Sequence, residues 1–270
     1  MSEPRGAALI TGASSGIGTC FAHQLAARGW PLLITARRGD RLAKLAETLN
    51  DAYGVPVEVV ALDLADPDAP AALFAATEAT GRPVEILINN AGYGLQGRFV
   101  DQDMAAIEPM IRLNVLALTE LTLRFARPMV AAGRGRILQV ASAAAFLPSP
   151  YVAAYAASKH YVKAFAEAVR FELRNTGVTM TTLYPGITRT EFNTVAGART
   201  PRLMNLSILS ADTVARIGLR AMFRGRRAVV PGLINKLNAF FSEALHRGLI
   251  THAAGRLLED ANGHHDKVTD

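Results

Sequence analysis

The segment YVAAYAASKHYVKAF, residues 151–165, places Tyr155 and Lys159 four positions apart in an apolar stretch that favours a helix. Side chains four apart on a helix are neighbours. An ammonium group about 4 Å from a phenol, at an effective dielectric constant near 20, is worth roughly 4 kcal/mol, or about three pKa units. Lys159 is therefore expected to lower the pKa of Tyr155, which would then donate or accept a proton. The alternative is packing alone, with the hydroxyl at the rim of a core.

A serine ends the strand-like run that precedes this helix. Ser142 closes RILQVAS, and its hydroxyl is expected to hydrogen-bond and position a substrate oxygen near Tyr155. Hydride transfer to a carbonyl needs a proton donor, and the reverse reaction needs a base. Ser142, Tyr155 and Lys159 would meet these needs. The alternative for Ser142 is an ordinary turn residue at a strand end.

A glycine-rich turn, TGASSGIG at residues 11–18, follows the first strand-like run and opens a helical pattern. Gly12, Gly16 and Gly18 would let the backbone turn tightly and approach a pyrophosphate, while a helix N-terminus favours negative charge. Such a string is a weak signal by itself because loops are rich in glycine. Its position directly after the first strand predicts a dinucleotide site.

The end of the second strand distinguishes between two cofactors. NAD sites commonly have a carboxylate there that hydrogen-bonds the adenosine ribose, whereas this strand ends in Arg37 and Arg38. A guanidinium group suits a phosphate. The pair therefore predicts NADP (NADPH), with NAD less favoured. The alternative is two solvated surface arginines.

Polar residues also follow two later strands. Asp63 comes after VEVVAL and is expected to accept from the adenine amino group. Asn89 and Asn90 end a strand in NNAG, and adjacent amides at a buried strand end need hydrogen-bond partners. A ribose or the backbone of the sheet would provide them.

Apolar runs of strand length alternate with helical patterns through most of the chain. This alternation predicts an α/β fold: a doubly wound, Rossmann-type parallel sheet with helices on both faces and ligands at the carboxyl ends of its strands. We expect a single cofactor-binding and catalytic domain at 1–231, followed by a C-terminal helical extension and tail at 232–270. Strands are predicted at 7–11, 31–36, 57–62, 84–92, 136–142, 178–186 and 226–231, and helices at 16–28, 41–53, 68–80, 103–131 and 153–175.

Composition narrows the class of protein. The 270 residues are 50% hydrophobic, with a net charge of +6 and one cysteine, Cys20, which fits a reducing, cytoplasmic setting. We expect no transmembrane segment, because no stretch approaches about 18 uncharged apolar residues. We also expect no metal and no nucleic acid partner, because the histidines lack ligand spacing and no DNA-binding motif is visible.

Taken in order, the motifs resemble those of the short-chain dehydrogenases/reductases, in their compact single-domain branch. They are TGASSGIG, NNAG, Asn114 in RLNVLA, Ser142, YAASK and PG at 185–186, over about residues 6–195. The resemblance implies NAD(P)-dependent hydride transfer by a catalytic tetrad of Asn114, Ser142, Tyr155 and Lys159. Asn114 would interrupt the long helix and hold a water that links Lys159 to solvent. Lys159 would also bind the nicotinamide ribose.

The same resemblance implies a homodimer or homotetramer, built through the helices at 103–131 and 153–175. Thr188 and Thr190 fall where the family's backbone and side-chain contacts to the nicotinamide carboxamide lie. Ser15 stands where many NADP-selective relatives have a second basic residue, which makes a strict NADP preference less certain. The expected cofactor-binding residues are Gly12, Ser14, Ser15, Gly16, Ile17, Gly18, Arg37, Arg38, Asp63, Leu64, Asn90, Ala91, Gly92, Tyr155, Lys159, Pro185, Gly186, Thr188 and Thr190.

Apolar residues after Ser142 and after the PG pair favour a lipophilic carbonyl or alcohol substrate, with core or interface packing as the alternative. A 3-oxoacyl-(carrier protein) reductase is an open alternative. A nucleotide-sensing binding protein without turnover is the rival class, disfavoured because the whole tetrad is present. The candidate pocket residues are Ala144, Phe146, Leu147, Tyr151, Phe192, Met204, Leu206 and Leu209.

A last pattern lies at 233–250. Its apolar side chains share one helix face, which predicts packing on the domain or a second subunit, a lid over the pocket, or a membrane anchor. The few cations of this helix argue against the anchor. We expect it to border the substrate entrance or a subunit contact. The stripe consists of Leu233, Ile234, Leu237, Phe240, Phe241, Ala244, Leu245 and Leu249.

Overall fold

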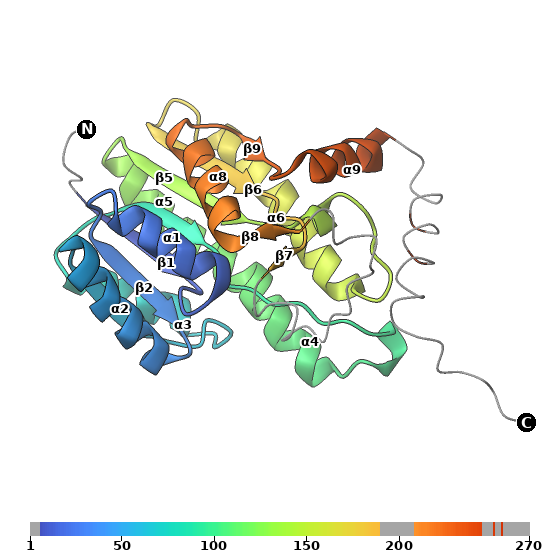
Figure 1. Ribbon diagram of the computed structural model, residues 1–270, viewed down its shortest axis with the longest axis horizontal. Helices are drawn as coiled ribbons and strands as arrows, with labels where there is room; N and C mark the ends of the chain where they lie inside the picture. Colours follow the sequence, from blue (N-terminus) through green and yellow to red (C-terminus); the bar gives the residue numbers. More distant parts are fainter. Residues whose placement is uncertain (1–5, 190–207, 245–250, 252–254, 256–270) are drawn as a thin grey trace, which may run out of the picture.

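A computed structural model describes residues 6–189, 208–244, 251 and 255 (Figure 1). Its main sheet has seven strands in the order β3-β2-β1-β4-β5-β6-β9, and all neighbouring strands are parallel. The strand order reverses between β1 and β4, and in such sheets ligands bind beyond the carboxyl ends at this point. The strands are β1 (Ala7–Thr11), β2 (Leu32–Ala36), β3 (Val57–Ala61), β4 (Val84–Asn89), β5 (Gly135–Val140), β6 (Val178–Leu183) and β9 (Ala228–Val229).

Helices cover both faces of this sheet, which confirms the predicted doubly wound fold (Figure 1). One hydrophobic cluster joins the sheet to α1 (Gly16–Ala26), α2 (Gly39–Tyr53) and α8 (Ala211–Phe223). A second cluster joins the opposite face to α3 (Ala69–Ala79), α5 (Leu118–Ala131) and α6 (Ala153–Glu172).

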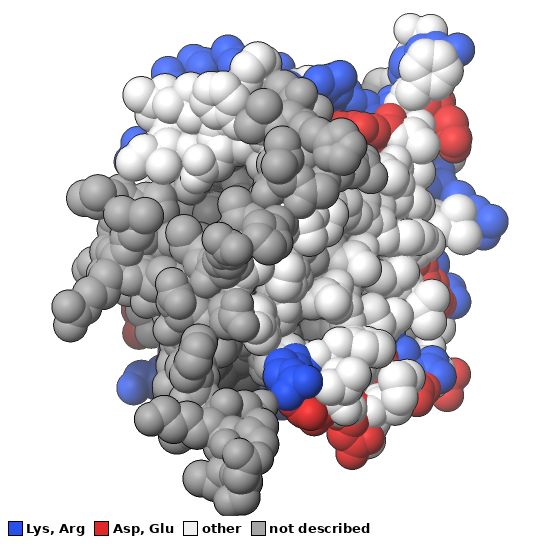
Figure 2. All heavy atoms as spheres, turned by 90° about the vertical axis from the view of Figure 1, so that its right-hand side faces the viewer, with Lys and Arg blue, Asp and Glu red and all other residues white. Residues whose placement is uncertain are grey.

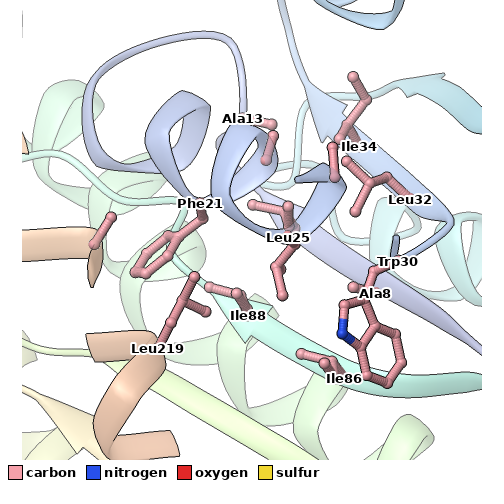
Figure 3. Close-up of a cluster of buried hydrophobic side chains, with 14 of the residues drawn as sticks. Ala8, Ala13, Phe21, Leu25, Trp30, Leu32, Ile34, Ile86, Ile88 and Leu219 are labelled. Atoms are coloured by element: carbon pink, nitrogen blue, oxygen red, sulfur yellow. The ribbon is translucent and has the colours of Figure 1, made fainter. Parts of the chain in front are cut away.

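The central strands are mostly buried because both of their faces are covered. β1 is buried at every position. Figure 3 shows how Phe21 and Leu25 of α1 lie over Ile88 of β4, beside Leu219 of α8. β3, at the sheet edge, is more exposed and carries Glu58, as edge strands commonly do.

The long helix predicted at 103–131 has three parts. α4 (Met104–Ile111) begins at Asp103, whose carboxylate accepts from the Ala105 N–H at 2.9 Å. A π-helical segment (Arg112–Ala117) follows and leads into α5. The interruption therefore contains Asn114, as the family resemblance implied. π-helical turns inside α-helices frequently mark functional sites.

Helix α8 was not predicted from the sequence, although its signals are present. Ser210 caps it, with the hydroxyl accepting from the Thr213 N–H at 3.2 Å, and its apolar residues recur at helical spacing. Before it, β7 (Thr188–Arg189) and β8 (Leu209–Ser210) form a small parallel pair.

The helix predicted at 233–250 is present as α9 (Leu233–Ala244), and 245–250 lie outside the described residues. α9 extends away from the sheet on the side that also carries α4 (Figure 1). Packing of its apolar stripe on the domain, one of the alternatives, is not found. The described side chains of the stripe are exposed to between 45% and 72%: Leu233, Ile234, Leu237, Phe240 and Phe241.

The opposite face of α9 is turned inward, where Asn235 and Ala239 are buried. Figure 2 faces this side of the molecule and shows an uncharged area near its upper left edge, with Lys and Arg above it. No helix within the described ranges has both the length and the apolar character that a bilayer crossing requires.

Candidate active site

A cleft of about 580 Å³ opens at the carboxyl ends of β1, β2, β4 and β5. It extends from the glycine-rich turn to Tyr155 and the PG turn, and it brings together most of the residues predicted to bind a cofactor. Gly18 and Asn114 are not on its surface, and Thr190 lies outside the described residues. The predicted residues that line it are Gly12, Ser14, Ser15, Gly16, Ile17, Arg37, Arg38, Asp63, Leu64, Asn90, Ala91, Gly92, Ser142, Tyr155, Lys159, Pro185, Gly186 and Thr188.

The glycine-rich turn has the backbone that a pyrophosphate site requires. Gly12 and Gly16 have φ of +67° and +58°, a conformation that favours glycine. A Cβ at Gly18 would overlap the Gly12 carbonyl oxygen and approach the Asn90 amide to 2.7 Å. The turn therefore leads directly into the N-terminus of α1, where backbone N–H groups attract anions. These residues fit a dinucleotide.

Asn90 fixes this turn to the neighbouring strand. Its side-chain amide donates to the carbonyl oxygens of Thr11 (2.9 Å) and Gly12 (3.2 Å), and the Thr11 hydroxyl accepts from the N–H groups of Asn90 and Ala91. Asn89 points instead into the core. The protein thus supplies partners for the side-chain N–H groups of Asn90 and Asn89, whereas the buried side-chain oxygen of Asn89 has none among the described residues. The bonds of Asn90 hold the ends of β1 and β4 together.

Arg37 and Arg38 both line the cleft beside the glycine-rich turn. Arg38 donates from Nε and Nη2 to the Ser14 hydroxyl at 3.3 and 3.1 Å. Arg37 lies 3.7 Å from the carboxylate of Asp63, and both side chains are largely exposed. A phosphate at this end of the cleft would meet two guanidinium groups and a serine hydroxyl.

Tyr155 is half-buried on α6, where it lines the cleft. Its hydroxyl hydrogen-bonds Ser142, which lowers the phenol's pKa, but burial has the larger effect and raises the pKa of Tyr155 to about 12. The expectation that Lys159 would make Tyr155 acidic is therefore not met, because desolvation of the phenolate outweighs every other influence. A phenol with this pKa keeps its proton at neutral pH.

Lys159 lies one turn further along α6 and is 4% exposed. Its ammonium group donates to the Val140 carbonyl oxygen at 3.1 Å and lies 5.8 Å from the centroid of the Tyr155 ring. Burial lowers the pKa of Lys159 to about 8. A Cβ on Gly92 would clash with the side-chain oxygen of Asn114 at 2.8 Å and would touch this ammonium group at 3.4 Å.

Asn114 is completely buried in the π-helical segment, directly behind the cleft. Its amide donates to the Tyr93 carbonyl oxygen at 2.9 Å and to the Ser158 hydroxyl at 3.2 Å, while its oxygen accepts from the Tyr93 N–H at 3.2 Å. Asn114 thereby joins the loop after β4 to α6, next to Lys159.

The remaining cleft wall is mostly apolar. Of the predicted pocket residues, Ala144 and Leu147 line it, whereas Phe146 packs on Tyr184 with ring centroids 4.7 Å apart. Tyr151 and Leu209 do not line it, and Phe192, Met204 and Leu206 lie outside the described residues. Residues that the sequence did not reveal include Tyr93, Ser149, Ile187, and the α9 residues Asn235, Asn238 and Ala239.

An open parallel sheet, a glycine-rich turn after its first strand, and a tyrosine beside a buried lysine in one cleft define a dinucleotide-dependent oxidoreductase. Residues 6–201 match the family described as short chain dehydrogenase, and the chain belongs to that family. It is 40% identical over 188 residues to a sulfoacetaldehyde reductase from Chromohalobacter salexigens, a match that covers 69% of this chain and 74% of the relative.

Solved structures of the family include complexes with either cofactor. A short-chain dehydrogenase from Sphingobium yanoikuyae, in complex with NADPH, is 33% identical, with a TM-score of 0.78 over 91% of this chain and 95% of that one. A family member from Burkholderia phymatum, in complex with NAD, is 27% identical, with a TM-score of 0.80 over 89% and 94%.

Proposed function

We propose that this protein is an NADPH-preferring enzyme that interconverts a carbonyl compound and its alcohol, with Tyr155 as the proton donor and acceptor. The observation that carries the proposal is the Tyr155 phenol itself. It is half-buried in the wall of the dinucleotide cleft, hydrogen-bonded to Ser142, and holds its proton at neutral pH because its pKa is about 12.

Bound NADPH would supply the hydride to the carbonyl carbon. The hydroxyls of Ser142 and Tyr155 would bind the carbonyl oxygen, and Tyr155 would donate its proton to that oxygen as negative charge develops on it. The phenolate left behind lies beside the Lys159 ammonium group, which would stabilise it until solvent returns a proton. Asn114 would hold the α6 side of the site through Ser158.

The adenosine end supports NADPH over NADH. Arg37, Arg38 and Ser14 form a cationic, hydrogen-bonding corner, and guanidinium groups recognise phosphate oxygens well. Asp63 is the carboxylate at this end, but its 3.7 Å ion pair with Arg37 neutralises part of its charge. We include in this proposal that the predicted cofactor-binding residues of the cleft, from Gly12 to Thr188, contact NADPH.

We further propose an uncharged substrate with apolar surface. Among the described residues of the cleft, the cations are Arg37 and Arg38 at the adenosine end and Lys159 beside Tyr155. The wall near Tyr155 is formed by side chains such as Ala144, Leu147 and Ile187. Apart from Lys159, the described residues near Tyr155 offer no cation to pair with a sulfonate, the group that distinguishes the substrate named for the relative from Chromohalobacter salexigens.

The test is a panel of carbonyl compounds assayed with NADPH and with NADH. It includes aliphatic ketones and aldehydes, steroids, 3-oxoesters, 3-oxoacyl thioesters and sulfoacetaldehyde. We expect turnover of neutral lipophilic carbonyls with NADPH. Tyr155→Phe should reduce kcat by roughly 10²–10⁴-fold, the usual worth of general acid catalysis, with NADPH binding retained. A Tyr155→Phe enzyme that keeps a tenth of its kcat would contradict the proposal.

A further inference from the structure

Helix α9 is amphipathic, and its orientation is the reverse of what hydropathy predicts. The face that carries Asn235 and Asn238 is turned toward the cleft, and the apolar face is exposed. Asn235, Asn238 and Ala239, at positions i, i+3 and i+4, share the face that lines the cleft. The exposed apolar stripe, which contains Leu237 and Phe240, lies on the other side. Two amides therefore stand where a helix that simply closes an apolar pocket would present leucine or alanine.

Asn235 holds the helix against the PG turn. It is 6% exposed, and its amide donates to the Pro231 carbonyl oxygen at 2.9 Å. Gly186 has no side chain at the point of contact, since a Cβ there would overlap the Asn235 carboxamide. The glycine of the PG pair thus admits Asn235, and this contact fixes the rotation of α9 relative to the cleft.

Asn238 lies one turn further along α9 and is exposed, so its carboxamide can hydrogen-bond a ligand. It lines the same cleft as Tyr155, and no described residue is a hydrogen-bond partner of its carboxamide. A carboxamide both donates and accepts hydrogen bonds and carries no charge. It therefore recognises a neutral polar group such as a hydroxyl, an amide or an ester, and it gives a carboxylate or sulfonate no counter-charge.

We propose that Asn238 is a specificity-determining residue, which selects carbonyl substrates that carry a second, neutral hydrogen-bonding group remote from the reacting carbonyl. This inference rests on the proposed function and narrows its substrate class. Leu147, Ile187 and Ala239 would contact the apolar part of such a substrate, and the Asn238 carboxamide would hydrogen-bond its polar end.

The test compares methyl alkyl ketones of increasing chain length with the same ketones bearing a terminal hydroxyl group. At one chain length, the wild-type enzyme should prefer the hydroxyketone by about 2- to 10-fold in kcat/KM, the worth of one neutral hydrogen bond. Asn238→Leu should abolish that preference and leave NADPH binding unchanged. The matched control is Leu237→Ala, a neighbouring substitution on the exposed face.

A second measurement separates this inference from the proposed catalytic role. Dissociation constants of both ketone series are measured by calorimetry in the NADPH complex of the Tyr155→Phe protein, with and without Asn238→Leu. If wild type turns over neither series, the proposed function fails, and the binding data still judge Asn238. Equal affinity for both series at every chain length, or a hydroxyl preference that survives Asn238→Leu, would overturn the inference.

Discussion

Burial controls the two ionisable groups at the centre of the site. It favours the neutral form of each, so it raises the pKa of Tyr155 to about 12 and lowers that of Lys159 to about 8. As pH rises from neutrality, Lys159 therefore loses its proton before Tyr155 does. The lysine, rather than the catalytic phenol, should set the alkaline limit of carbonyl reduction.

We expect kcat/KM for reduction to fall as pH rises through about 8. Lys159 is positively charged below that pH and neutral above it, and a neutral amine does not stabilise the developing phenolate. In Lys159→Arg the cation persists, because a guanidinium group does not deprotonate in this range. Its activity should be lower, but the alkaline limb should move to higher pH. If the decrease in kcat/KM stays near pH 8 in this variant, a group other than Lys159 causes it.

Cofactor preference is also decided by single residues. Arg37→Ala should weaken NADPH binding by about 10- to 100-fold, the range for a charge-assisted hydrogen bond, and NADH binding much less. Arg38→Ala should affect both cofactors, because Arg38 also braces the glycine-rich turn through Ser14. Fluorescence titration with each cofactor measures this, with Lys44→Ala, an exposed substitution on α2, as control. Equal affinity of wild type for NADPH and NADH would refute the assignment.

At the scale of elements, a buried hydrogen-bond network holds β4, β5 and α5 together beneath the site. The Asn89 amide donates to Gln139 (3.1 Å) and to the Thr122 hydroxyl (3.0 Å), and the Gln139 amide donates to the same hydroxyl (2.8 Å). Asn89 is the last residue of β4, and Gln139 is the last but one of β5. The residue after each makes a hydrogen bond in the site: Asn90 to the glycine-rich turn, and Val140 to Lys159. The network therefore fixes the positions of β4 and β5 relative to each other beneath the site.

Gln139→Leu should lower the free energy of unfolding by about 1–3 kcal/mol, because it removes two buried hydrogen bonds, one from the Asn89 amide and one to the Thr122 hydroxyl. Urea denaturation of the protein measures this. Thr48→Ala serves as control, since it removes only an exposed hydrogen bond from Thr48 to the Lys44 carbonyl oxygen. A loss in Gln139→Leu no larger than in the control would show that the network adds little stability.

Sequence patterns identify reactive residues and local turns better than they identify which face of a helix turns toward the core. The glycine-rich turn and the Tyr155–Lys159 spacing follow from neighbours along the chain, and both are found in the structure. The interruption at Asn114, which is also found, was implied by the family resemblance alone. The periodicity of α9 shows which residues share a face, but it does not show which face turns inward. Hydropathy favours burial of the apolar stripe, yet the geometry of the PG turn at Gly186 places Asn235 inside.

The pKa of Tyr155 could not be predicted from the sequence, because it depends on the surroundings of the phenol in the folded protein. The spacing to Lys159 gives the strength of one pairwise interaction, whereas the desolvation that dominates comes from every element around the phenol. The helix at 233–250 was expected to border the substrate entrance or a subunit contact. Its residue Asn238 was missed because the periodicity does not show which face of the helix turns toward the cleft.

Among the described residues, two of the exposed apolar surfaces have different surroundings. One is the outer stripe of α9. The other lies where α5 and α6 run side by side, joined by the 3.0 Å hydrogen bond between the hydroxyls of Thr119 and Tyr161. Leu116 and Leu123, on the same side of the helix as Thr119, are 54% and 51% exposed. Isolated apolar residues on a surface are ordinary, but rows of them on adjacent helices favour an interface.

We therefore expect a homo-oligomer that assembles through α5 and α6. Leu123→Asp should convert it to a monomer, because the interface would have to bury an unpaired carboxylate. The matched variant Phe240→Asp, which places the same charge on the outer stripe of α9, should leave the assembly intact. Light scattering coupled to size-exclusion chromatography measures the mass of each protein. The reverse result, with dissociation by Phe240→Asp alone, would place the subunit contact on α9 and bring the substrate cleft next to the partner subunit.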